Sequence, residues 1–270
     1  MDRILHTHRV DGIARILDAD VQAVIMAPPE PPPWLSALAA AVENGEATIP
    51  RTQLTDYSRD LFAAWLDRNL PPLPVFDPVR DDMLVLVDLL AALTGASRFM
   101  IRLLTGAPNT ECGFHVDTVP PGAPQWGLLR VYNGAGTHYV EPGNVLGPRD
   151  FYDYLGQRER LGRERASARE TGDRPACEAA EAAIRRLDAQ RPFLRDPSAL
   201  RCTPAGAIVA FKHLDVAAHW SDRFEETPWI HCSPMAGPPR LLINITALDQ
   251  GPRHRRPPDA RVPQAPGPGA

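Results

Sequence analysis

Three residues able to bind one metal ion lie far apart in this sequence, and a fold that uses them together must bring them to one place. His115 and Asp117 are two positions apart, and His231 follows far downstream. In an extended strand, residues i and i+2 point to the same face, about 6.6 Å apart. One segment can therefore supply two ligands, while the third must come from a neighbouring strand. This spacing favours a sheet-based fold.

The residue types in this pattern point to oxidation chemistry. Two imidazoles and one carboxylate form the facial ligand set that holds non-haem Fe(II) and leaves coordination positions open. Arg240, shortly after His231, adds a planar cation that can grip a carboxylate with two parallel hydrogen bonds. His213 and His219 are alternative third ligands, but only His231 has the following arginine. We therefore expect a metal centre with an organic-acid cosubstrate.

Composition limits the other function classes. At 270 residues, with 44% hydrophobic residues and a net charge of −4, the chain can form a real core and offers no electrostatic case for nucleic-acid binding. The four cysteines form no CxxC pair, and the N-terminus carries no apolar leader. These features predict a cytoplasmic protein without a membrane anchor. They leave its oligomeric state open.

Hydrophobic periodicity predicts a helical first part followed by strands. A strand over 21–27 precedes helices over 34–42, about 57–68 and about 80–94. His6 and His8 are expected near a mobile terminus. The later strands are expected over 98–104, 114–119, 127–133, 137–140, 206–213 and 240–248.

Alternation within two of these strands separates their faces. Arg130 and Tyr132 share one face of their strand and are candidates for the cavity wall, although a tyrosine on a half-buried strand more often packs with its hydroxyl satisfied. Around 240–245, Arg240 lies on the polar face, while leucine and isoleucine fill the other. The apolar faces of the N-terminal helices need a sheet as partner.

The chain also contains an interruption and a tail. Residues 149–191 are rich in Arg, Glu and Ala and predict a helical insertion, either a solvated charged helix pair or a lid over a substrate pocket. Residues 251–270 are rich in proline and are expected to be disordered. The expected organisation is an α/β flank over 1–97, a core over 98–250 and this tail.

The motifs around these residues resemble a known superfamily. Phe114-His115-Val116-Asp117, the Leu128–Asn133 strand with its Gly-Ala-Gly-Thr sequel, and His231 with Arg240 are similar to the iron(II)/2-oxoglutarate-dependent dioxygenases. The order of Cys-Gly-Phe-His-Val-Asp, Tyr-Asn-Gly-Ala-Gly-Thr and His-Cys-Ser-Pro more narrowly resembles a bacterial family of unknown function. The resemblance covers roughly 98–248 without the insertion.

The resemblance implies an α+β protein with a double-stranded β-helix, also called a jelly roll or cupin-like fold, and helices packed on one sheet. His115, Asp117 and His231 would bind Fe(II), and Arg240 would hold the distal carboxylate of 2-oxoglutarate. Arg130, Tyr132 and Ser233 are further candidates for cosubstrate contacts. The implied activity is an oxygenase, a hydroxylase above all, acting on a small molecule or a peptidyl side chain.

Two other functions stay open at this point. The same ligands can hold Zn²⁺ or Ni²⁺ in a cupin-like metal-binding or metal-handling protein without turnover, because affinity order alone does not favour iron. A jelly roll that binds a ligand without metal is the third possibility. Leu242, two residues after Arg240, stands where many superfamily members carry a hydroxyl residue. The metal is therefore better supported than the cosubstrate.

Overall fold

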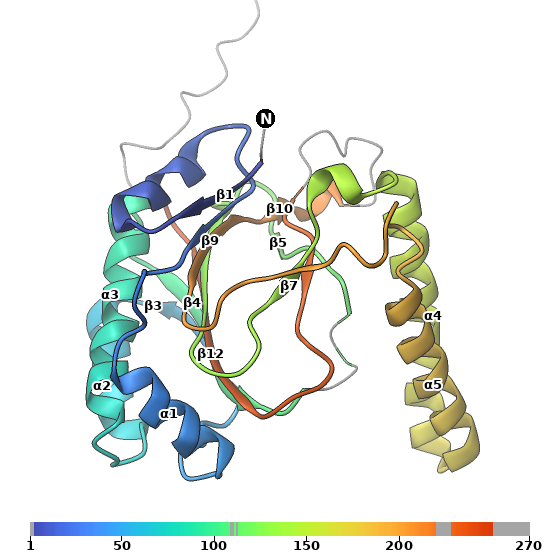
Figure 1. Cartoon of the computed structure of the whole chain (residues 1–270), viewed down its shortest axis with the longest axis horizontal. Coiled ribbons are helices and arrows are strands. Elements are labelled where there is room, and N and C mark those ends of the chain that lie inside the picture. Colours follow the sequence, from blue (N-terminus) through green and yellow to red (C-terminus); the bar gives the residue numbers. More distant parts are fainter. Residues whose placement is uncertain (1–2, 109–110, 112, 220–227, 251–270) are drawn as a thin grey trace, which may run out of the picture.

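A seven-stranded sheet forms the centre of the computed structural model, which describes residues 3–108, 111, 113–219 and 228–250 (Figure 1). Within this sheet β1 and β2 pair in parallel, and the other neighbouring strands pair antiparallel. In spatial order the strands are β1 (Ile4–Thr7), β2 (Ala23–Met26), β9 (Ile208–Lys212), β6 (Trp126–Val131), β12 (Arg240–Ala247), β4 (Phe99–Gly106) and β3 (Thr52–Tyr57).

Short strands form two smaller groups beside this sheet. The first pairs β5 (Thr118–Val119) with β10 (Leu214–Asp215) in parallel, and the second runs β11 (His231–Cys232), β7 (His138–Tyr139) and β8 (Arg201–Cys202), all antiparallel. Tyr139 of β7 packs with Val209 and Phe211 of β9 in one buried cluster. The short strands therefore face one side of the large sheet.

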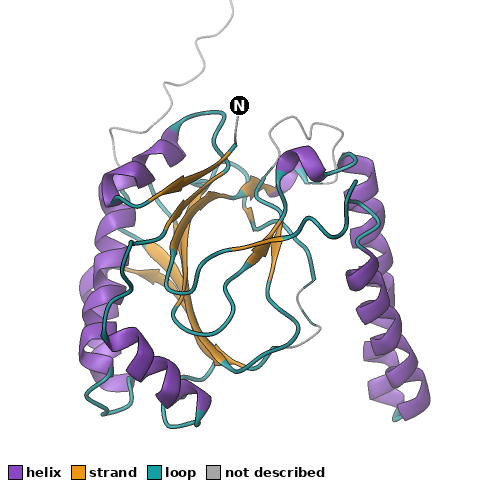
Figure 2. Ribbon diagram, viewed as in Figure 1, coloured by secondary structure: helices purple, strands orange, loops and turns teal. Residues whose placement is uncertain are grey.

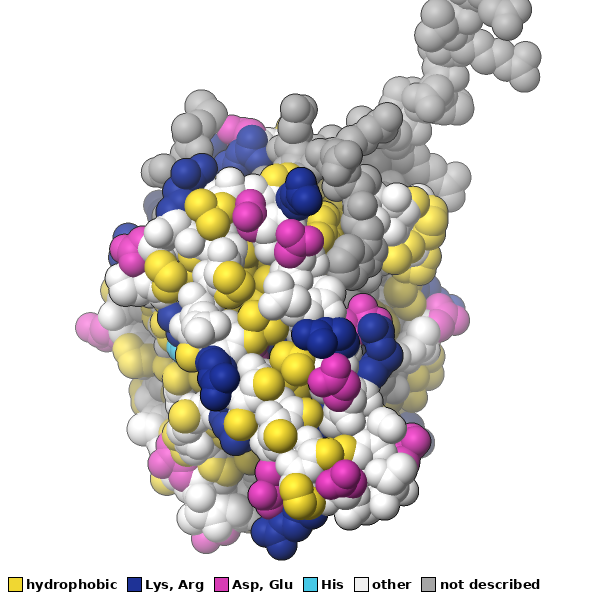
Figure 3. Space-filling view, turned by 90° about the vertical axis from the view of Figure 1, so that its right-hand side faces the viewer, with side chains coloured by type: hydrophobic (Ala, Val, Ile, Leu, Met, Phe, Trp, Pro, Cys, Tyr) yellow, Lys and Arg dark blue, Asp and Glu magenta, His cyan; other side chains and the backbone are white. Residues whose placement is uncertain are grey.

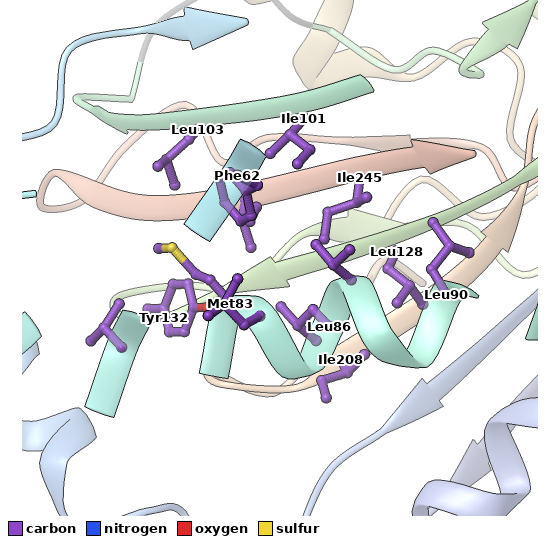
Figure 4. Close-up of a cluster of buried hydrophobic side chains, with 14 of the residues drawn as sticks. Phe62, Met83, Leu86, Leu90, Ile101, Leu103, Leu128, Tyr132, Ile208 and Ile245 are labelled. Atoms are coloured by element: carbon purple, nitrogen blue, oxygen red, sulfur yellow. The ribbon is translucent and has the colours of Figure 1, made fainter. Parts of the chain in front are cut away.

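Helices cover the other side of the large sheet (Figure 2). They are α1 (Trp34–Glu43), α2 (Arg59–Asn69) and α3 (Phe76–Thr94); short 3-10 helices span Val10–Leu17, Pro142–Asn144 and Val216–Ala218. The side chains between helices and sheet form the largest core, with Met83 and Leu86 of α3 beside Leu128, Ile208 and Ile245 of the sheet (Figure 4). A mixed α/β architecture with helices on one sheet face was predicted and is confirmed.

Helix α3 shows how the sequence specifies this layer. Val79, Met83, Leu86 and Leu90 recur at helical spacing and are 0–1% exposed. Each such side chain, fully buried, contributes roughly 1.5–3 kcal/mol of transfer free energy. The helix ends where Gly95 adopts φ 70°, a left-handed conformation that favours glycine. The predicted stop at this glycine is confirmed.

Strand β12 separates the two faces of the sheet as its alternation predicted. Leu241, Ile243 and Ile245 are 0% exposed in the core under the helices. Asn244 and Thr246 point to the opposite face, where their side chains meet Asp117 and His213. The polar side of β12 thus looks toward the short strands.

Two expectations about local structure are wrong, and one helix begins later than expected. The segment 114–119 is not one strand, because its backbone bonds to several partners: His115 pairs with His231, and only Thr118–Val119 is strand. The helix expected over about 57–68 is confirmed, but it begins at Arg59, capped by Ser58, because Thr52–Tyr57 is an edge strand. His6 does not lie in a loose segment, because β1 adds to the sheet beside β2. The predicted tail from 251 lies outside the described residues.

The insertion forms a helix hairpin, α4 (Pro148–Thr171) and α5 (Arg174–Gln190), on the side opposite to the other helices (Figure 1). Its outer surface mixes basic and acidic side chains (Figure 3), including pairs such as Arg163–Glu159 and Arg174–Glu178. Its inner surface is apolar and packs on Phe114 and Val116 in a second buried cluster. No helix of the described residues has the length and apolarity needed to cross a membrane.

Candidate metal centre

His115, Asp117 and His231 converge in the structure. Each offers one ligand atom, and these three atoms all lie within 4.8 Å of one another. Asp117 Oδ1 is 3.7 Å from His115 Nε2, and Asp117 Oδ2 is 4.0 Å from His231 Nε2. The structure thus brings together the three residues that the sequence pattern selected.

Backbone pairing aligns the two imidazoles. The N–H of His115 donates to the carbonyl of His231 at 2.9 Å, and the N–H of His231 donates to the carbonyl of His115 at 3.0 Å. Residues paired in this antiparallel manner place their side chains on the same face. The ring centroids are consequently 4.4 Å apart.

Both rings are fixed in the tautomer that a metal requires. His115 Nδ1 lies 2.8 Å from the carbonyl oxygen of Gly113, and His231 Nδ1 lies 3.0 Å from that of Trp229. A carbonyl only accepts, so each Nδ1 donates, and each Nε2 is the ring nitrogen left facing Asp117 as a ligand atom. This outer hydrogen bond is what orients metal-binding histidines in general.

Burial keeps His231 neutral. Trp229 stacks on its ring, with centroids 4.3 Å apart and planes at 17°, and the side chain is 6% exposed. Burial, with His115 beside it, lowers the pKa of His231 to about 4. The imidazole is therefore ready to bind a cation at neutral pH without first losing a proton.

Asp117 supplies the negative charge. Burial alone would raise its pKa, but His231 and His115, together with His213 and Arg102, outweigh this effect and bring the pKa to about 2. Asn244 Nδ2 donates to Asp117 Oδ2 at 3.3 Å, so a side chain of β12 also orients the carboxylate. The group stays ionised over the whole physiological range.

The donor set fits a divalent transition metal. Bonds of about 2 Å from nitrogen and carboxylate oxygen to one ion place neighbouring donors roughly 3–3.5 Å apart. The three donor atoms lie within 4.8 Å of one another, so small side-chain shifts would bring them to one ion. Two neutral imidazoles and one carboxylate suit Fe(II), Zn²⁺ or Ni²⁺ rather than Ca²⁺ or Mg²⁺, which prefer oxygen ligands. Three protein ligands leave coordination positions for other molecules.

Arg240 is a buried guanidinium at the start of β12. It is 4% exposed, and within the described ranges no carboxylate lies at ion-pair distance from it. Its Nη1 donates to the carbonyl of Ala135 at 2.9 Å, and its Nε has no partner in that part of the chain. A buried cation without a counter-charge is costly. The backbone carbonyls of Ala135 and Gly136 are the hydrogen-bond partners that the described residues give to it.

Arg130 and Tyr132 do not face the metal cluster, and the expectation that they line the cavity is wrong. Arg130 Nη1 donates to Asp82 Oδ1 at 2.6 Å, and the Tyr132 hydroxyl donates to Asp82 Oδ2 at 2.8 Å. Asp82 belongs to α3, on the helix side of the sheet. Because both faces of β6 are covered, polar alternation alone did not identify which face holds the cavity.

The remaining candidates lie around the centre. Ser233 is partly buried in the loop after β11, two residues from His231. His213, the rival ligand, is buried with its Nε2 3.3 Å from Thr246 Oγ1, and His219 Nδ1 lies 3.4 Å from the Tyr152 hydroxyl. Neither rival belongs to the three-residue group.

Two cavities border the centre. One, of about 370 Å³, lies between the exposed side of His115 and helix α4, with Leu155 and His219 on its wall. The other, of about 140 Å³, is lined by Asp117, Arg102, His213 and Thr246. Sequence reasoning missed Arg102, whose only signal was its place on an expected strand, 98–104.

Solved structures similar to this chain include three with identities between 12 and 15%. A Pseudomonas putida prolyl-4-hydroxylase has 13% identity and a TM-score of 0.39, with 90% of this chain and 100% of that chain covered. The rice dioxygenase for auxin oxidation has 15% identity and a TM-score of 0.41, with 93% and 84% covered. AviO1 from Streptomyces viridochromogenes Tue57 has 12% identity and a TM-score of 0.37, with 91% and 99% covered.

A family match covers most of the chain. No curated protein matches the sequence of this chain. Residues 7–245 match the family described as protein of unknown function (DUF1826), in agreement with the narrower resemblance seen in the motifs. This span includes the three metal-ligand candidates, Arg240 and the helix hairpin. The chain is a member of the DUF1826 family.

Proposed function

We propose that this protein is an Fe(II)- and 2-oxoglutarate-dependent oxygenase whose sheets form the two walls of a jelly roll. The observation that carries the proposal is the convergence of His115, Asp117 and His231 with both Nδ1 atoms tied to carbonyl oxygens. That arrangement presents one carboxylate and two neutral imidazoles to one ion. Bound Fe(II), with 2-oxoglutarate and O2, would supply the oxidising chemistry.

The protein's own residues would then bind and orient the ion and the cosubstrate and shield the ion from water. His231, under Trp229, would hold its side of the ion away from water, and Asn244 would keep the Asp117 carboxylate in place. Arg240 would receive the distal carboxylate of the cosubstrate, because it is buried without a counter-charge. The open side of His115, which is 35% exposed, would admit a small molecule or a peptidyl side chain.

The test is succinate formation by the full chain with Fe(II), ascorbate and 2-oxoglutarate. We expect slow succinate release even without substrate, abolished by Asp117→Ala. Arg240→Gln should raise KM for 2-oxoglutarate at least about 30-fold, since removing a buried partner of a charge costs about 2–5 kcal/mol. Arg98→Gln serves as the control, because this guanidinium is 46% exposed and lies 3.8 Å from Asp56 at the surface; it should leave KM for 2-oxoglutarate unchanged. No succinate and no 2-oxoglutarate binding would refute the cosubstrate assignment.

A second function is favoured by one observation. Arg240 Nη1 is already engaged by the backbone carbonyls of Ala135 and Gly136. If no cosubstrate binds there, the same three ligands would serve a metal-binding or metal-handling protein for Zn²⁺ or Ni²⁺. Elemental analysis of protein purified without chelators separates the two. One equivalent of Zn or Ni per chain, with a metal content that does not change when 2-oxoglutarate is added, supports the second function.

A further inference from the structure

The helix hairpin is connected to the metal centre by a chain of hydrogen bonds. His115 Nδ1 donates to the carbonyl of Gly113, and the same peptide group continues in the N–H of Phe114, which donates to the Tyr154 hydroxyl at 3.0 Å. That hydroxyl donates to Asp188 Oδ1 at 2.6 Å. One peptide group therefore joins a metal-ligand candidate to helix α4 and, through Asp188, to α5.

Charge and burial strengthen the far end of this chain. Asp188 has a side chain that is 0% exposed and forms an ion pair with Arg158, whose Nε lies 3.0 Å from Oδ1. Arg158 Nη1 also donates to the carbonyl of Glu111, four residues before His115. Burial, with Asp188 beside it, raises the pKa of Tyr154, so the hydroxyl keeps its proton. Linked hydrogen bonds polarise one another in such surroundings.

Packing shows that the segment and the hairpin are fitted to each other. A Cβ on Gly113 would overlap Arg158 Nε and lie 2.6 Å from the Tyr154 hydroxyl. Phe114 packs edge-on against Phe193, at 5.4 Å between centroids, and Tyr154 packs on the same ring at 4.8 Å. A merely solvated helix pair would not need this contact.

We propose that the α4–α5 hairpin positions the metal ligand His115 through Tyr154, which fixes the Gly113–Phe114 peptide that orients the imidazole. This inference rests on the metal site proposed above. Tyr154 acts as a positioning residue: it touches neither ion nor substrate, but holds the acceptor that keeps the His115 proton on Nδ1. The Nδ1 of His231 is held by a different carbonyl, that of Trp229, so the hydrogen-bond chain through Tyr154 orients the His115 ring and not the His231 ring.

The experiment measures Co²⁺ binding by the full chain, with dissociation constant and visible Co²⁺ absorption as readouts. Tyr154→Phe should weaken Co²⁺ binding about tenfold, the lower end of the effect known for groups behind a metal ligand, and should change the absorption spectrum. Asp188→Asn keeps an acceptor for the hydroxyl but removes the charge, so its effect should be smaller. It also provides a readout if Tyr154→Phe does not fold.

Two control variants separate positioning from stability. Tyr152→Phe removes a hydroxyl from the same helix that lies against His219, and should leave Co²⁺ affinity unchanged. Asp173→Ala removes the N-cap of α5 at the tip of the hairpin, and should lower its thermal stability without changing Co²⁺ affinity or spectrum.

The outcomes distinguish this inference from the proposed function. Co²⁺ binding by the wild type, with affinity and spectrum unchanged in Tyr154→Phe and Asp188→Asn, overturns the positioning role alone. An equal loss of affinity in Asp173→Ala overturns it as well, because general loosening of the hairpin would then suffice. No Co²⁺ binding by the wild type overturns the metal site and the positioning role together.

Discussion

The buried ion pair between α3 and β6 gives a sharp test of where Arg130 and Tyr132 act. Asp82 accepts from Arg130 at 2.6 Å and from the Tyr132 hydroxyl at 2.8 Å, and the Arg130 side chain is 5% exposed. Asp82→Ala would leave a buried guanidinium and a buried hydroxyl without this acceptor. Removing one partner of a buried pair costs about 3–5 kcal/mol. Because the Asp82 side chain is 17% exposed, we expect the lower end, about 3 kcal/mol.

The assay is thermal and denaturant unfolding of the metal-free protein. A loss of about 3 kcal/mol corresponds to a Tm about 6–12 °C lower in a protein of this size. Asp81→Ala is the matched control, since Asp81 is the next residue, is 77% exposed and pairs with Arg80 at the surface. Its cost should stay within about 0–1 kcal/mol.

Metal and 2-oxoglutarate binding complete this test. Asp82→Ala should leave the affinity for both unchanged, because the pair lies on the helix side of the sheet. A loss below about 1 kcal/mol would refute the structural role given to the pair. A selective loss of 2-oxoglutarate affinity, at unchanged stability, would restore Arg130 and Tyr132 to the cavity wall.

Further predictions concern the metal centre and its supports. Because burial lowers the pKa of His231 to about 4, the unfolded chain binds a proton at this histidine before the folded chain does. The free energy of unfolding of the metal-free protein should therefore fall by about 3 kcal/mol as the pH drops from about 6.5 to 4. His231→Asn should reduce this dependence of stability on pH, and an unchanged dependence would contradict the prediction. Co²⁺ at 100 times its Kd should add about 2.7 kcal/mol of stability to the wild type and none to Asp117→Ala, as measured by Tm. Gly136→Ala should disrupt the β7–β8 contact and lower the Tm, because its Cβ would overlap the Thr203 carbonyl. A variant with the Tm of the wild type would refute this.

The sequence alone predicted the elements whose pattern is local. Helix α3 has its apolar spacing and its terminal glycine, so its end was predicted closely, although it begins at Phe76 and not near 80. Strand β12 has strict alternation and was predicted closely at both ends. The three metal-ligand candidates could be selected because their residue types match one metal-ligand set and Arg240 follows the third of them. These local patterns show which face of a helix or strand is buried, but they do not identify the element that packs against that face.

The features that the sequence did not predict depend on long-range partners. Edge strands β1 and β3 carry few apolar residues, so their pairing shows only in the assembled sheet. The prediction assigned Arg130 and Tyr132 to the wrong face of the sheet, because their hydrogen-bond acceptor, Asp82, lies on a helix far upstream in the sequence. The sequence did not predict the inner face of the hairpin for the same reason: the Tyr154 hydroxyl and Asp188 form a hydrogen bond only when α4 and α5 pack together.

The central claim is that His115, Asp117 and His231 hold one Fe(II) ion with room for a 2-oxoacid. Anaerobic addition of 2-oxoglutarate to the Fe(II) protein tests it most directly, because chelation of the ion by the oxoacid gives a weak visible charge-transfer band. We predict that this band appears at one equivalent of iron in the wild type and is lost in Asp117→Ala. Stoichiometric iron binding that survives Asp117→Ala, or the absence of any band at saturating 2-oxoglutarate, would contradict the account.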